Sequence, residues 1–169
     1  YRHQSLIKGL KMNTSNIKKY APQARNDFIA AMRKQAAKYG ITADSILPAE
    51  QKGDLLLIGD QVFPLSVMKP RDKLIKRIQA TSFEQTIDYI AYSWFNRLCA
   101  IRYMECKGLL DHGRRVLSSA DGSAGLPQIL EECLDIDLPG LDASRVAELK
   151  LDGNKDEELY RELLLAQCH

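Results

Sequence analysis

The sequence lacks the features that mark several common classes of protein. It has no run of the roughly 18 consecutive apolar residues that a membrane-spanning helix needs, and its first residues lack the apolar core of a secretory signal. Neither a GxGxxG nor a GxxxxGK[ST] phosphate-binding loop is present. We therefore expect a cytoplasmic protein that binds no membrane and has no nucleotide-binding loop of these kinds.

Metal-binding and catalytic patterns are also missing. The four cysteines form no CxxC pair, and the three histidines stand in unrelated contexts, which argues against a zinc site or a disulfide framework. The acidic stretch from Asp152 to Asp156 resembles a calcium loop, but Glu157 and Leu163 stand where an EF-hand needs glycine and glutamate. No Ser-His-Asp constellation occurs. We predict no catalytic, cofactor-binding or metal-binding residue in this chain.

The charge of the chain is unevenly distributed. Its 169 residues, 45% hydrophobic, predict one globular domain with a formal net charge of only +2. Residues 1–107 have 18 Lys and Arg against 9 Asp and Glu, whereas residues 108–169 have 6 against 13. Such asymmetry indicates either a first half that faces nucleic acid or simply solvated helix faces of mixed charge.

Periodic apolar residues predict a mainly α fold. Residues 1–11 precede Met12 and are interpreted as an extension or a remnant of cloning, and residues 12–169 as one helical accessory domain of a larger protein. A change of period around Gly59-Asp60 predicts one short β-hairpin, residues 54–58 and 61–63. Helices are expected at 15–20, 22–39, 66–79, 82–107, 127–134, 144–151 and 155–167, with a break before Pro22 and an Asn154 cap on the last.

The longest of these helices is expected to be the centre of the core. A capping box at Thr81-Ser82-Phe83-Glu84 predicts its start, and Gly108 its end. Apolar side chains surround its middle turns almost completely, because Cys99 and Tyr103 widen the apolar stripe, so we predict a long, central, buried helix. The residues predicted to form the structural core are Phe83, Ile87, Trp94, Leu98 and Ile101.

Positive charge is concentrated in the first half of the chain, above all between residues 69 and 77. Lysine and arginine on an exposed helix face contact phosphates without reading sequence. The residues predicted to bind DNA are Lys18, Lys19, Arg25, Lys69, Arg71, Lys73, Lys76 and Arg77.

Four segments together resemble a known family. Residues 91–105, AYSWFNRLCAIRYME, resemble the WFNRxxxIRxME helix that precedes the catalytic domain of PglX-type adenine-specific DNA methyltransferases of BREX phage defence and, more loosely, of type IIG restriction–modification enzymes. Residues 12–31, 112–117 and 137–168 agree with the same family in the same order.

The resemblance implies a site-specific N6-adenine methyltransferase that uses S-adenosylmethionine, of which this chain is an N-terminal domain. The [N/D/S]PP[Y/F] tetrapeptide that contacts the flipped adenine, and the FxGxG-type turn that holds the cofactor, are absent here. The expected partners are therefore DNA, through the parent enzyme, and its own catalytic domain. The alternative is a protein-interaction module that docks other BREX components or is bound by a phage inhibitor; a free-standing basic nucleic-acid-binding domain is a third reading.

Overall fold

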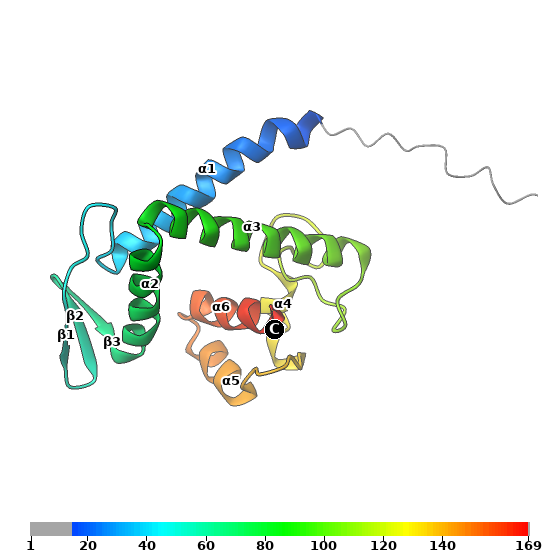
Figure 1. Ribbon diagram of the computed structural model, residues 1–169. Coiled ribbons are helices and arrows are strands. Elements are labelled where there is room, and N and C mark those ends of the chain that lie inside the picture. The colour runs from blue at the N-terminus through cyan, green and yellow to red at the C-terminus, as the bar shows by residue number, and fades with distance from the viewer. Residues whose placement is uncertain (1–14, 169) are drawn as a thin grey trace, which may run out of the picture. The chain divides into compact units, whose positions relative to one another are not determined.

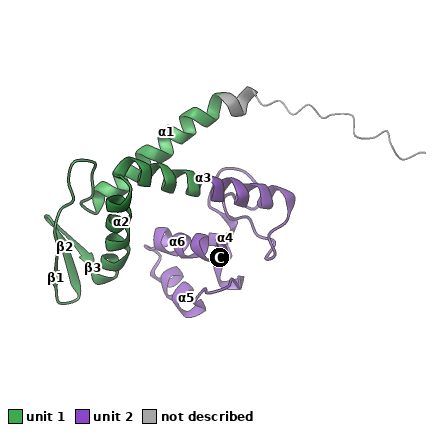
Figure 2. Ribbon diagram, in the orientation of Figure 1, with its two compact units in different colours: residues 1–93 green, residues 94–169 purple. Residues whose placement is uncertain are grey.

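The computed structural model describes the backbone of residues 15–168 and the side chains of residues 19–168 (Figure 1). The predicted extension, residues 1–11, lies outside the described residues. The predicted fold class is confirmed: the described chain is mainly α, with one small antiparallel sheet. The described residues pack as two compact units, one that ends at Ser93 and one that begins at Trp94 (Figure 2), a division that the composition did not indicate.

The first unit begins with one long helix where two were predicted. Helix α1 (Ser15–Lys38) continues through Pro22, so the expected break is absent. A proline inside a helix costs about 3 kcal/mol. The turns after Pro22 are nevertheless helical, and Ala24 and Ala36 on them are buried. The helix is followed by Gly40, which has a φ of 70°, and a Cβ there would lie 2.6 Å from the Ile58 side chain.

A three-stranded antiparallel sheet follows, in the order β1 (Ala49–Lys52), β2 (Leu55–Ile58) and β3 (Gln61–Pro64). The hairpin of β2 and β3 and its Gly59-Asp60 turn were predicted correctly. Strand β1 was not predicted, because its four polar and small residues are all exposed and show no alternation. The 3₁₀ turn η1 (Leu65–Val67) then leads into α2 (Met68–Ala80).

Two apolar clusters hold the first unit together. One joins α1, α2 and the start of α3 (Phe83–Lys107), and the other lies on the inner face of the sheet. Their buried members are Ala36, Ile41, Phe83 and Ile87 in the first, and Leu56, Ile58 and Phe63 in the second.

The second unit contains the end of α3 and four short elements: α4 (Gln128–Glu131), η2 (Cys133–Asp135), α5 (Ala143–Asp152) and α6 (Asp156–Gln167). Their core includes Ile101, Val116, Ile129, Leu149, Leu159 and Leu163. Asp142 caps α5 by accepting hydrogen bonds from the amides of Ser144 and Arg145. The predicted Asn154 cap is wrong, because the residue before α6 is Lys155 and no side chain caps that end.

Helix α3 corrects part of the predicted core. Its start is capped one residue later than expected, since the Ser82 hydroxyl accepts a hydrogen bond from the Gln85 amide at 3.1 Å. Phe83, Ile87 and Ile101 are buried, but Trp94 and Leu98 are only partly buried, and Cys99 and Tyr103 are exposed. The boundary between the two units falls between Ser93 and Trp94. The core of each unit includes residues from one end of α3, and neither includes its middle turns.

Candidate nucleic-acid interface

Four basic residues form one exposed face of α2. Lys69, Lys73, Lys76 and Arg77 follow one another at helical spacings of four, three and one residues, and all four are exposed. Among the described residues, none of the four makes a salt bridge. We call these four residues the α2 basic face. Their charges are available to a polyanion without loss of an internal ion pair.

Arg71 does not belong to this face, which corrects its predicted role. It is 6% exposed and points from α2 toward the core of the first unit. Its Nε donates a 2.9 Å hydrogen bond to the carbonyl of Tyr39, and its guanidinium also donates to the carbonyl of Leu47. Arg71 therefore ties the end of α1 and the following loop to α2. The helical period places it opposite the other cations of the segment.

The predicted residues of α1 differ among themselves. Lys19 is exposed, whereas the side chain of Lys18 lies outside the described residues. Arg25 is exposed but pairs with Asp88 of α3 at 3.3 Å, which neutralises much of its field. Arg33, which the sequence did not single out, pairs with Glu84 in the same way. Within the predicted set, the strongest uncompensated charge thus lies on α2.

Cations of the second unit are mostly paired with carboxylates. Arg145 contacts three glutamates of α5 and α6, and hydrogen bonds to Glu148 and then Glu158 raise its pKa above the ordinary arginine value. This pairing distinguishes the second unit from the α2 basic face. The other paired cations are Arg102, Arg114, Arg115 and Lys155.

A buried carboxylate that the sequence did not reveal organises the loop after α3. Arg102 and Glu105, three residues apart on α3, form an ion pair, and the Glu105 side chain is completely buried. One oxygen of Glu105 accepts hydrogen bonds from the amides of Val116 and Leu117, at 2.8 and 2.7 Å. The other oxygen accepts hydrogen bonds from the Ser118 hydroxyl and the Arg102 guanidinium.

These contacts decide the protonation of Glu105. Burial by itself raises the pKa of this carboxyl, but hydrogen bonds from Ser118, Leu117, Arg102 and Val116 outweigh burial and hold the pKa below its ordinary value. All acceptor positions face donors, so Glu105 is suited to fixing the loop and not to proton transfer. We assign it a structural role.

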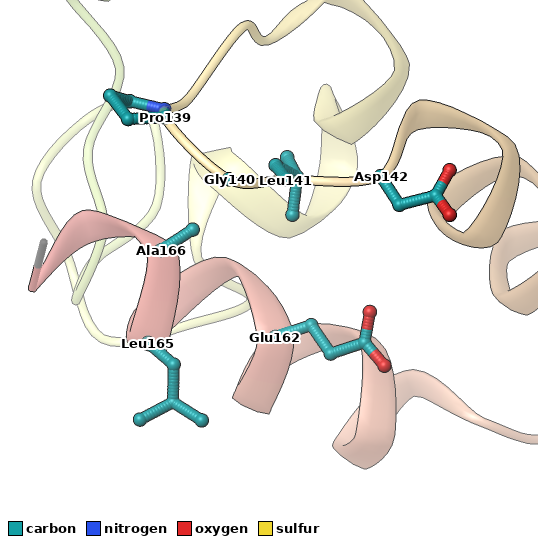
Figure 3. Close-up of a pocket in the computed structure, with 7 residues that line it drawn as sticks. All are labelled: Pro139, Gly140, Leu141, Asp142, Glu162, Leu165 and Ala166. Atoms are coloured by element: carbon teal, nitrogen blue, oxygen red, sulfur yellow. The ribbon is translucent and has the colours of Figure 1, made fainter.

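A hollow of about 550 Å³ lies between the loop before α5 and helix α6 (Figure 3). Its two carboxylates are already engaged, because Asp142 caps α5 and Glu162 lies 3.7 Å from the Arg145 guanidinium. The rest of the lining is apolar or backbone, with Pro139, Leu141 and Leu165 among it. This arrangement offers no nucleophile or acid–base pair.

The described residues also show no metal site and no membrane span. They contain no group of three His, Cys, Asp or Glu side chains placed to hold a metal ion. None of the described helices is long and apolar enough to cross a bilayer.

Comparison with known proteins gives two related sequences, although no family model matches the chain. It is 48% identical over 165 residues, 94% of its length, to the adenine-specific methyltransferase BrxX of Escherichia coli O9:H4 (strain HS). It is 30% identical over 138 residues, 75% of its length, to the adenine-specific methyltransferase PglX of Lacticaseibacillus casei (strain Zhang).

The chain corresponds to only a small part of these relatives, 14% of BrxX and 11% of PglX. Both matches nevertheless cover most of the chain, and both relatives are named adenine-specific methyltransferases. The chain is therefore related to the BREX-type adenine-specific methyltransferases and matches one segment of their polypeptide.

Proposed function

We propose that this chain is an accessory domain of an S-adenosylmethionine-dependent N6-adenine DNA methyltransferase of a BREX phage-defence system. In this proposal it packs on the catalytic domain and adds sequence-independent contacts to DNA phosphates. The observation that carries the DNA contact is the α2 basic face, whose four cations make no salt bridge among the described residues. Cofactor and catalytic residues belong to the rest of the parent enzyme, because this sequence lacks the adenine-contacting tetrapeptide and the glycine turn.

Removing charge from the α2 basic face is expected to weaken binding to all DNA sequences equally. In the full-length methyltransferase, a Lys73→Ala, Lys76→Ala, Arg77→Ala variant should flatten the dependence of log K on log salt by up to about 0.9 per lost phosphate contact. Fluorescence anisotropy over a series of salt concentrations measures both affinity and slope.

The matched control removes three exposed charges elsewhere, at Lys52, Lys107 and Arg161. It should change the slope less than the α2 variant does. Wild-type affinity and slope in the α2 variant would contradict the DNA contact and favour the alternative, a module that docks other defence components or a phage inhibitor.

The outer face of the sheet supports the packing part of the proposal. Leu57 and Val62 are cross-strand partners, as are Leu55 and Pro64, and they lie on the face opposite the buried Leu56 and Phe63. Leu55 is 48% exposed and Val62 is 59% exposed. An apolar cluster of this kind gains stability when another surface covers it. Relatives about seven times longer have polypeptide that could do so.

Charging this face is expected to loosen the domain only in the longer protein. Leu55→Lys with Val62→Lys should leave the melting temperature of the 169-residue chain nearly unchanged, because both side chains are already exposed. In the full-length enzyme the same pair should speed proteolytic release of the domain, measured by limited digestion with a protease that cleaves after glutamate, whose sites the substitutions leave unchanged. Gln35→Lys on α1 is the control. Equal digestion rates for the double variant and the control would contradict the contact between the outer face of the sheet and the rest of the enzyme.

A further inference from the structure

We propose that the surface shared by α2 and α3 in the first unit binds unpaired nucleotides, with bases stacked on Tyr92 and Tyr89 and phosphates along Lys73, Lys76 and Arg77. This inference rests on the proposed DNA contact and specifies its substrate class, single-stranded in place of duplex nucleic acid.

Two tyrosines stand on the exposed side of α3. Tyr92 is 67% exposed and Tyr89 is 54% exposed, although a tyrosine ring is largely apolar and gains stability when buried. Their spacing of three residues makes them neighbours on one face of the helix. The opposite side of the same helix faces the core through Phe83, Ile87 and Ala91.

Arg77 connects these rings to the α2 basic face. Its guanidinium carbon lies 3.9 Å from the centre of the Tyr89 ring, within the range of a cation–π contact. The contact joins the tyrosines of α3 to the cations of α2. It covers one side of the Tyr89 ring and places a positive charge next to it.

The combination of exposed rings and cations selects the ligand. In a duplex the bases stack on one another and offer a flat protein surface mainly phosphates, so an aromatic ring adds little. Unpaired bases can stack on aromatic side chains while cations follow the backbone, without regard to sequence.

The charge pattern favours a polyanion over a protein partner. The nearest acidic side chains on α3, Glu84 and Asp88, are engaged by Arg33 and Arg25 of α1. Asp72 flanks the α2 basic face but makes no salt bridge among the described residues, so it opposes only part of the positive field. Phosphates neutralise such a face and release counterions.

Binding of a fluorescent single-stranded thymidine oligonucleotide and of a duplex of equal length, measured by anisotropy, tests the proposal in the 169-residue chain and in the full-length enzyme. We expect tighter binding of the single strand. Tyr92→Ala should weaken that binding about 5- to 150-fold and leave duplex binding within twofold, whereas Tyr92→Phe should retain it. A uridine oligonucleotide should bind comparably, because the ring and the phosphates are common to both.

Tyr103→Ala is the matched control, since Tyr103 is 60% exposed on the same helix but belongs to the second unit. It should leave single-strand binding unchanged. Equal affinity for single strand and duplex, or Tyr92→Ala binding like wild type, overturns the inference. If either of these results is found and the variant with alanine at Lys73, Lys76 and Arg77 still loses duplex binding, the proposed phosphate contact is supported and the single-strand inference is wrong.

Discussion

Replacing Glu105 by Gln is expected to lower the free energy of unfolding of the second unit by about 3–5 kcal/mol, as when one partner of a buried charge pair is removed. The carboxylate is completely buried and accepts four donors. A glutamine keeps one acceptor oxygen and turns its amide hydrogens toward groups that themselves donate. The loop that contains Val116 and Ser118 therefore loses its anchor.

Urea denaturation followed by hydrogen exchange of the amides of α5 and α6, which lie in the second unit, measures this loss. Glu131→Gln is the control, because Glu131 is exposed and makes no salt bridge among the described residues. Hydrogen exchange should rise in residues 109–127 of Glu105→Gln and not in residues 49–64. Equal stability of the two variants would show that the Glu105 contacts contribute little to folding.

The same carboxylate predicts a specific dependence on pH. Its folded pKa is lowered because hydrogen bonds, from Ser118 first and then Leu117, Arg102 and Val116, outweigh the opposing effect of burial. The resulting stability is fully present above the ordinary glutamate pKa of about 4.3 and is lost as the pH falls through the lower folded value. The difference in melting temperature between wild type and Glu105→Gln should therefore narrow on acidification.

Replacing Arg71 by Leu is expected to destabilise the first unit by about 2–3 kcal/mol, because the carbonyls of Tyr39 and Leu47 lose their donors. Arg71→Lys should cost less, since an ammonium can still donate to one of them. Amide exchange measured by mass spectrometry should increase at the junction of α1, the following loop and α2.

Lys76→Leu removes an exposed charge from the same helix and is the control. If Arg71→Leu melts like Lys76→Leu but loses DNA affinity, Arg71 belongs to the binding surface after all, and its assignment to the core is wrong.

Local patterns in the sequence determined most of the secondary structure. Apolar spacing predicted the helical runs, and Gly108, which marked the expected end of the longest helix, has a positive φ in the structure. The Gly59-Asp60 turn identified the hairpin of β2 and β3. These features depend on residues close together in the chain, and for that reason composition and periodicity were sufficient to find them.

Tertiary structure decided which of these residues are available for binding. Arg71 and Lys73 are indistinguishable by charge and lie two residues apart, yet only the packing of α2 on α1 and the following loop buries the first and exposes the second. Trp94 was expected in the core, but it stands where the two units divide α3. The sequence spacing suggests only that Glu105 forms half of an ion pair within the helix. In the folded chain residues 116–118 lie against Glu105 and donate hydrogen bonds to it, so that its carboxylate holds this loop in place. Burial depends on contacts between residues distant in sequence, which a one-dimensional pattern does not specify.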